Sequence, residues 1–142
     1  MRLSKAARHA LLAATEMARS KDNGPVTVTL VARRNGIPEA ALAKVLQRLV
    51  RSGLAVGVRG VHGGYRLSRP PSEITVLDVL DVFEPSAHPV GATSRLGAGA
   101  PDHVGQLFDS VDEQLRSTFA SLTLDVLARN EGSPSTTVRP SR

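Results

Sequence analysis

The side chains best suited to chemistry in this sequence are three cations and an amide that recur at helical spacing. Lys44, Gln47, Arg48 and Arg51 stand at i, i+3, i+4 and i+7, so a helix places them on one face. Guanidinium and ammonium groups donate hydrogen bonds to phosphate oxygens, and an amide can pair with a base edge. The spacing therefore indicates a surface that binds nucleic acid, with an ordinary amphipathic surface helix as the alternative.

The helix that must position these groups is predicted over residues 38–51. Pro38 suits its first position, and Glu39 suits its first turn, where a carboxylate interacts favourably with the helix dipole. Ala40 and Ala41 are small enough to let the helix approach base edges closely, although they offer only methyl contacts. The opposite face carries an apolar stripe: Leu42, Val45, Leu46 and Leu49.

A shorter helix is expected just before this one. Thr27 has the side chain of an N-cap, and the helix that it opens runs through about Arg34. Asn35 and Gly36 then end it, because glycine tolerates the left-handed conformation. Two helices joined by such a turn form a helix-turn-helix, whose second helix lies in the DNA major groove. We include Thr27 among the candidate DNA contacts.

A glycine-rich hairpin follows the two helices. Residues 54–59 and 65–68 alternate between apolar and other side chains, which is typical of strands. The loop between them lacks the Lys-Ser/Thr ending of a P-loop and leads into a strand, which argues against nucleotide binding. As the tip of a wing it would lie against DNA, and Arg59 is the candidate for insertion into a minor groove. The other candidate contacts in the wing are Gly60, His62 and Arg66.

A helix is also expected at the start of the chain, over residues 3–19, with cations near its first turn. Cations at a helix N-terminus oppose the helix dipole, so their presence is better explained if phosphates lie close by. A solvated face is the alternative. The candidate contacts here are Arg2, Lys5 and Arg8.

The second half of the chain contains further helical segments separated by a loop. Thr75 and Asp78 have the spacing of a capping box that opens a short helix. Residues 85–101 are rich in Pro, Gly, Ala and Ser and lack apolar periodicity, which predicts a loop. A long helix is expected over residues 103–122, followed by a last short one.

The long helix carries apolar residues at steps of three and four. A long apolar stripe on a helix outside a compact domain is typical of a helix that pairs with the same helix of a second copy of the protein. Packing onto its own domain alone is the alternative. The residues expected at a dimer interface are Val104, Leu107, Phe108, Val111, Leu115, Phe119 and Leu122.

Charge is segregated along the 142 residues, whose net charge is +5. Through Arg69 there are thirteen Lys and Arg against three acids, a net +10, whereas the remainder has five Arg against ten acids, a net −5. A cationic half joined to an acidic half suits a polyanion-binding domain attached to a separate assembly element. A high-GC genome would explain the preference for Arg over Lys but not the segregation.

Composition excludes several classes of function. The sequence has no cysteine, which excludes disulfides, thiolate zinc sites and cysteine-ligated iron–sulfur clusters. His88, His103 and Asp102 are spread too widely for a specific metal site. No grouping of catalytic residues and no cofactor loop indicates an enzyme. No apolar run is long enough for a membrane span and no cleavage site follows the basic start, so we expect a cytoplasmic protein.

Taken together, these segments resemble the Rrf2 family of bacterial transcription regulators over about residues 1–130. The resemblance is carried by MRL at the start, GPV at 24–26, the helix-turn-helix, VRGVHGGYRL at 58–67 and EITVLDVLDVFE at 73–84. It implies a homodimeric winged helix-turn-helix repressor or activator that binds a dyad-symmetric promoter site. It also implies DNA contacts from the helix at 38–51, from Arg59 and from Gly60.

Members of that family commonly hold an iron–sulfur cluster through three cysteines in the loop after the fourth helix. The matching loop here, residues 85–101, has none. The resemblance therefore implies a cluster-free member that senses a small molecule, senses a protein partner or acts constitutively. The chain departs from the polar or aromatic residues that members often carry at Pro38, Ala40, Ala41 and Ala43, so no operator sequence carries over.

The expected fold is mainly α with a small β-hairpin. We expect a winged helix-turn-helix DNA-binding domain at 1–84, a flexible loop at 85–102, dimerisation helices at 103–130 and a disordered tail at 131–142. The expected function is that of a homodimeric repressor that binds a palindromic site in double-stranded DNA, without a cofactor, a metal or a membrane partner. The alternative is a protein-interaction module or a nonspecific nucleic-acid binder that uses the same winged domain.

Overall fold

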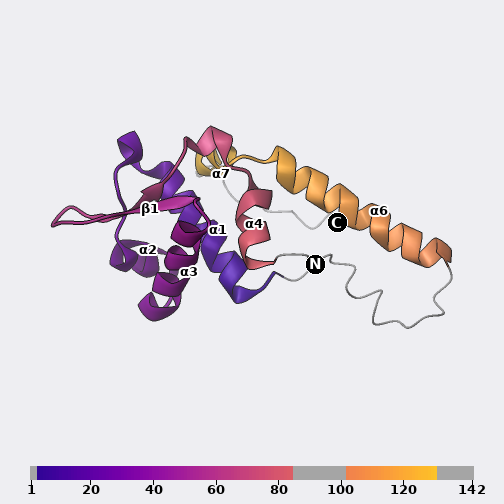
Figure 1. The fold of residues 1–142 in the computed structure, drawn as a ribbon, viewed down its shortest axis with the longest axis horizontal. Helices are drawn as coiled ribbons and strands as arrows, with labels where there is room; N and C mark the ends of the chain where they lie inside the picture. Colours follow the sequence, from indigo (N-terminus) through magenta and orange to yellow (C-terminus); the bar gives the residue numbers. More distant parts are fainter. Residues whose placement is uncertain (1–2, 85–101, 131–142) are drawn as a thin grey trace, which may run out of the picture.

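The computed structural model describes residues 3–84 and 102–130, and it is mainly helical with one antiparallel hairpin (Figure 1), as predicted. In chain order the elements are α1 (Lys5–Arg19), η1 (Lys21–Asn23), α2 (Val28–Asn35), α3 (Glu39–Arg51), β1 (Ala55–Val58), β2 (Gly64–Leu67), η2 (Pro71–Glu73), α4 (Val76–Phe83), α6 (Asp102–Ser121) and α7 (Leu124–Arg129). We call residues 3–84 together with α7 the head.

Helix α1 is the centre of the head, with α3, α4 and α7 packed around it. Ser4 caps it, since its hydroxyl oxygen accepts the Ala7 N–H at 3.1 Å. Its buried side chains are almost all small, which lets three helices approach its axis closely. The fully or almost fully buried residues of α1 are Ala7, Ala10, Ala13, Ala14 and Met17.

The helix-turn-helix forms as its sequence predicts. The Thr27 hydroxyl oxygen accepts the Leu30 N–H at 3.2 Å, and Gly36 ends α2 with φ 62° in the left-handed region. Pro38 stands one residue outside α3 as its N-cap, because its extended ψ of 131° is not helical. The predicted stripe of α3 is buried, and each large apolar side chain so buried contributes about 1.5–3 kcal/mol. Burial of that stripe leaves the basic side of α3 in solvent.

The wing consists of β1 and β2, paired from Ala55↔Leu67 to Val58↔Gly64. A two-stranded hairpin is marginal alone, and here a third segment supports it. Val26 donates to the Tyr65 carbonyl and the Tyr65 N–H donates to the Val26 carbonyl, both at 2.8 Å. The wing is thereby fixed to the residue that precedes the helix-turn-helix.

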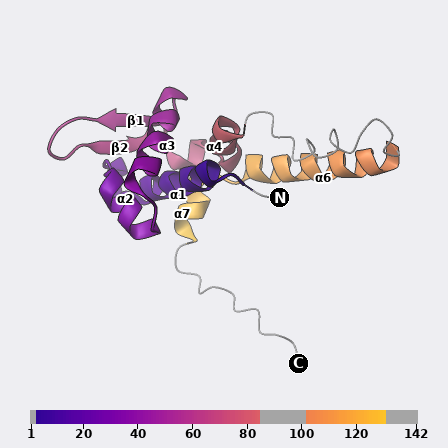
Figure 2. The same ribbon diagram turned by 90° about the horizontal axis from the view of Figure 1, so that it is seen from below.

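The C-terminal part of the chain leaves the head in α6 and returns to it in α7. Thr75 and Asp78 form the predicted capping box of α4, with bonds of 3.0 and 2.9 Å. Helix α6 extends away from the head along the longest axis of the molecule (Figure 2). The chain then comes back, since the Val76 N–H donates to the Leu122 carbonyl at 2.8 Å and the Leu124 N–H to the Ile74 carbonyl at 2.9 Å. Leu124 is fully buried, so α7 belongs to the core of the head.

Two expectations lie outside the described residues: the loop over 85–101 and the tail over 131–142. The boundaries of the DNA-binding and dimerisation domains likewise stay predictions. Within the described ranges, no helix combines the length and the apolar character that crossing a membrane requires.

Candidate nucleic-acid interface

Most of the predicted contact residues belong to α3 and the hairpin, which with α2 form the end of the head opposite α6 (Figure 2), whereas Lys5 and Arg8 belong to the start of α1. On α3, Ala41 is half-buried and the other candidates are exposed: Glu39, Ala40, Lys44, Gln47, Arg48 and Arg51. In and beside the wing, Arg66 is half-buried and three are exposed: Arg59, Gly60 and His62. Lys5, Arg8 and Thr27 are exposed as well, and Arg2 lies outside the described residues.

A short connection joins α3, the candidate recognition helix, to the wing. Ser52 caps α3, and Gly53 turns the chain with φ 82°, a conformation that favours glycine. The Leu54 N–H then donates to the Leu49 carbonyl at 3.0 Å, while the Ser68 hydroxyl donates to the Gly53 carbonyl at 2.6 Å. Both ends of the hairpin are therefore hydrogen-bonded at the end of α3, which sets the orientation of the wing relative to that helix.

Glycines in the wing have two different roles. Gly60 has φ 114°, a conformation that favours glycine, and open space around its Cβ position. Gly64 is packed instead, because a Cβ there would lie 2.3 Å from the Val26 carbonyl oxygen. Gly63 is equally crowded, with its Cβ position 2.2 Å from the Val58 carbonyl oxygen. These two glycines therefore allow the wing to fold and to dock.

Two of the candidate cations already have partners within the head. Arg48 Nη2 donates to the Val82 carbonyl at 2.7 Å, and its Cζ lies 4.4 Å from the centroid of the Phe83 ring. Arg66 Nη1 donates to the Leu67 carbonyl at 3.3 Å. Lys44, Arg51 and Arg59 are exposed, so they stay candidates for contacts with DNA.

A buried carboxylate that the sequence patterns did not single out anchors the helix-turn-helix. Glu16 of α1 is only 7% exposed, and Arg34 Nη1 lies 3.1 Å from its Oε2 while Asn35 Nδ2 donates to its Oε1 at 3.4 Å. Arg19 Nη1 is 3.9 Å from the same Oε1. The role of Glu16 could have been predicted from its position: it stands three residues after Ala13, on the same face of α1 as the small buried residues.

At the other end of α1, a second carboxylate fixes the helix start. Glu84 Oε1 accepts the Ser4 N–H at 2.9 Å. The hydrogen bonds from Ser4 hold the pKa of the Glu84 carboxyl below its ordinary value, because they stabilise the ionised form more than slight burial disfavours it. Residue 84 is the last one described before the gap, so this bond attaches the end of α4 to the start of α1.

The predicted dimer stripe of α6 divides into two parts. Phe119, near the end of α6, and Leu122, just after it, pack against the core of the head. Further from the head, Leu107, Phe108 and Val111 are 62%, 44% and 46% exposed. Val104 and Leu115 are half-buried. The exposed part is an apolar surface on a projecting helix, the kind of surface that usually meets another protein.

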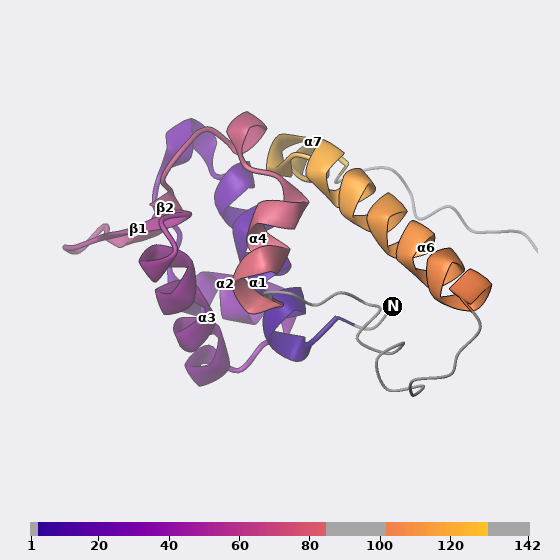
Figure 3. The same ribbon diagram turned by 45° about the vertical axis from the view of Figure 1, so that its right-hand side comes forward.

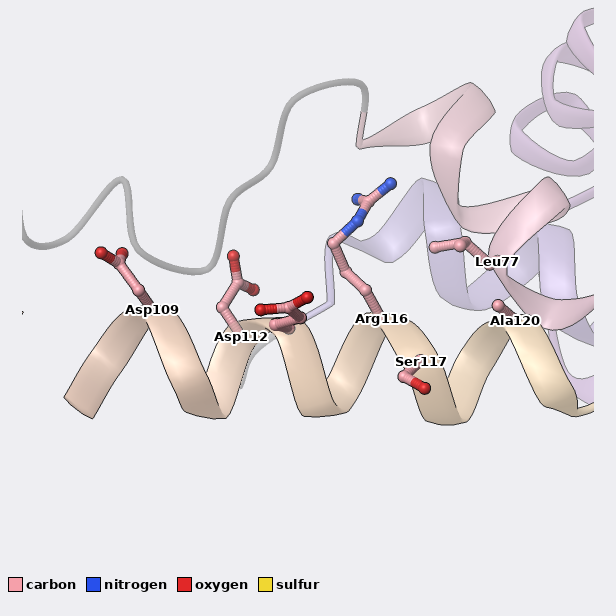
Figure 4. A pocket seen from close by; sticks show the side chains of 7 residues that line it. Leu77, Asp109, Asp112, Arg116, Ser117 and Ala120 are labelled. Carbon is pink, nitrogen blue, oxygen red and sulfur yellow. The ribbon is translucent and has the colours of Figure 1, made fainter. Parts of the chain in front are cut away.

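A groove of about 530 Å³ lies between α4 and α6 (Figure 4). Asp109, Asp112 and Arg116 extend from α6 on the side where Leu77 of α4 lies, and the Arg116 guanidinium reaches Asp81 at 3.4 Å. The groove is open and holds no arrangement of nucleophile and base. Among the described residues, no group of three His, Asp or Glu could hold a metal ion.

The iron–sulfur cluster that the family resemblance implies for other members does not fit these 142 residues. Such a cluster needs three thiolates, and the chain has no cysteine to supply them. The loop that would carry them, residues 85–101, lies outside the described residues.

The sequence and the structure are both similar to those of known transcriptional regulators. The Rrf2 family, described as "Iron-dependent Transcriptional regulator", matches residues 3–130. The HTH-type transcriptional regulator IscR of Photorhabdus laumondii is 29% identical over 133 residues, which are 92% of this chain and 81% of that protein. The structure is similar to that of CymR, the global cysteine regulator of B. subtilis, with a TM-score of 0.80 at 26% identity over 91% of this chain and 97% of CymR. It is also similar to IscR of T. potens, with a TM-score of 0.76 at 27% identity over 92% of this chain and 89% of that one.

The match covers every described residue, and the relatives are transcriptional regulators rather than enzymes. The exposed basic side of α3 and the wing beside it are what a winged helix-turn-helix uses on DNA. The chain is therefore a DNA-binding transcriptional regulator that belongs to the Rrf2 family.

Proposed function

We propose that the protein is a homodimeric repressor that binds a dyad-symmetric promoter site and works without an iron–sulfur cluster. The observation that carries the proposal is the exposed side of α3, with Lys44, Gln47 and Arg51 in solvent and the wing fixed beside it. One such unit reads one half-site, and a twofold dimer presents two units at a fixed spacing.

Within this proposal, α3 lies in the major groove and the wing lies along the adjacent backbone. Lys44 and Arg51 contact phosphates, Gln47 reaches a base edge, and Ala40 and Ala41 allow close approach. Arg59 enters the minor groove, where a narrow, A·T-rich segment attracts a guanidinium. Lys5 and Arg8 add phosphate contacts from α1.

The exposed apolar part of α6 supplies the dimer contact. Leu107, Phe108 and Val111 project from the head, and a second copy of the helix would cover them. The effector is a small molecule or a protein partner that alters the dimer, unless the repressor is constitutive.

Selection of bound fragments from the host genome, followed by titration at several salt concentrations, tests the proposal. We expect affinity to fall steeply with salt and a preference of about 10³ or more for the selected site over random duplex. A nonspecific nucleic-acid binder would show the salt dependence without the preference, and a protein-interaction module would show neither.

Arg59→Ala tests the wing separately. We expect it to weaken binding to the selected site by about 1–3 kcal/mol and to relax preference at the bases beside the wing. Arg129→Ala is the matched control, because it removes the same charge from an exposed side chain of α7. An equal loss on all sequences would make Arg59 a phosphate contact only.

A further inference from the structure

The last turn of α4 and its C-cap contact three other helices through four consecutive residues. Asp81 pairs with Arg116 of α6 at 3.4 Å, and the Glu84 carboxylate accepts the Ser4 N–H at the start of α1 at 2.9 Å. Between them, the Val82 carbonyl and the Phe83 ring both meet Arg48 of α3. Figure 3 shows α4 in this central place, between α3 and α6.

Arg48 has the role of a C-terminal cap for α4. The final carbonyls of a helix have no donor within the helix, and Arg48 Nη2 donates to the one on Val82 at 2.7 Å. A cation at this end also interacts favourably with the helix dipole. The guanidinium at the same time lies 4.4 Å from the centroid of Phe83, whose ring is only 8% exposed.

These two contacts restrain α3 in a way that its apolar stripe does not. Hydrophobic burial determines which side of α3 faces the core, but it is non-directional and permits small changes of tilt. A planar group held by a hydrogen bond and by a ring face has a defined position and plane. Arg48 stands in the C-terminal half of α3, so it fixes that half against α4 while Lys44 and Gln47 stay exposed.

We propose that Arg48 is a positioning residue: by capping α4 and packing on Phe83, it holds the recognition helix at the tilt that reads DNA. This inference rests on the proposed function of α3 and changes the role of one residue within it. One N–H of the guanidinium is used on Val82 and its plane is held against Phe83, so its position is set by α4 rather than by a ligand. The end of α4 consequently determines the orientation of α3 relative to the rest of the head.

Phe83→Leu tests the proposal without touching the DNA-facing surface, since it removes the ring and keeps an apolar side chain. Val79→Ala is the matched control, because Val79 is buried one turn earlier in α4. We expect Phe83→Leu to weaken binding to the selected site about two- to fivefold, the size that one cation–π contact of an exposed guanidinium can supply, and to leave random-duplex binding and the salt slope unchanged. Val79→Ala should lower thermal stability without this loss of preference.

Arg48→Lys and Arg48→Ala complete the test with the core intact. Both should lose preference as Phe83→Leu does, and the double variant Arg48→Ala/Phe83→Leu should be no weaker than Arg48→Ala alone. Lysine keeps the charge but not the planar fork, so failure of Arg48→Lys to restore preference distinguishes positioning from a phosphate contact.

The opposite pattern would overturn the inference. If Arg48→Ala lowers the salt slope by about one on every duplex, Arg48→Lys restores binding and Phe83→Leu behaves like Val79→Ala, Arg48 is a phosphate contact. A wild-type chain that binds its site but is indifferent to Phe83→Leu overturns this inference alone. A wild-type chain with no sequence preference overturns the proposed function and this inference together.

Discussion

Single polar side chains at the ends of helices hold the elements of this protein in place. Ser4, Thr27 and Thr75 each accept a backbone N–H three residues on, and Glu84 accepts the N–H of Ser4 itself. Each such bond satisfies a donor that the helix cannot satisfy internally. Glu84 differs from the others because its partner is eighty residues away, so its bond connects two helices rather than one turn.

The pH dependence of Glu84 follows from that bond. Because the folded-state pKa of this carboxyl lies below its ordinary value of 4.5, ionised Glu84 stabilises the fold at neutral pH. That contribution disappears as the pH falls through the lowered pKa. We expect Glu84→Gln to lower the free energy of unfolding at neutral pH by less than about 1 kcal/mol, since the site is near solvent, and to match wild type in acid.

Urea titrations at a series of pH values measure this difference. Glu73→Gln is the control, because it removes the same charge from an exposed residue of η2. A deficit of Glu84→Gln that persists unchanged into acid would mean that the side chain acts through packing rather than through its charge.

Residues whose partners are nearby in sequence were the ones that sequence patterns could predict. The Thr75–Asp78 capping box and the Thr27 cap depend on a spacing of three, which is visible in the sequence. The hydrogen-bond partners of Glu16 and Arg48 lie on other helices, so no local spacing reports them. The sequence therefore assigned Arg48 to the DNA surface by its place on the helix alone.

At the scale of elements, the wing shows how a short segment obtains stability from its neighbours. Its two strands have four residues each, too few for an independent hairpin, and the paired bonds with Val26 extend the ladder. Alternating side chains predicted both strands correctly. The reason for Gly64 could not be predicted, because it depends on how closely Val26 approaches in the folded protein.

Gly64→Ala should therefore damage the wing far more than an ordinary glycine substitution does. The new Cβ would lie 2.3 Å from the Val26 carbonyl oxygen, and φ is 153°, which L-residues rarely adopt. We expect the free energy of unfolding to fall by at least about 2 kcal/mol, measured by thermal or urea denaturation. DNA binding should weaken as well, because the wing would separate from the helix-turn-helix.

Gly57→Ala is the control for this substitution. Gly57 lies in β1 with open space around its Cβ position and no unusual φ. It should be neutral or slightly stabilising, because alanine restricts the unfolded chain. A Gly64→Ala protein as stable as Gly57→Ala would show that the bridge between Val26 and Tyr65 does not hold the wing.

At the scale of the whole molecule, the basic and the acidic parts of the sequence lie towards opposite ends of the structure. The described cationic residues of the first half lie in the head, with α3 and the wing at one end, and the acidic second half includes α6, which projects from the opposite end. Such an arrangement keeps the carboxylates of α6 away from the phosphates that the basic end would meet. It also leaves the apolar part of α6 free to meet a second copy without covering the DNA-binding end.

Val111→Asp tests that assembly. Val111 is 46% exposed, so the monomer should fold normally, whereas in a dimer the new carboxylate would be buried in an apolar contact at a cost of several kcal/mol. We expect sedimentation to show the 15.0 kDa monomer instead of twice that mass, with loss of binding to palindromic DNA and retention of weak half-site binding. Ser117→Asp introduces the same charge on the side of α6 that lines the groove, and it should leave the dimer intact.

An unchanged mass for Val111→Asp would mean that the dimer contact lies elsewhere. A monomeric wild-type protein that still binds a palindrome tightly would contradict the twofold arrangement itself.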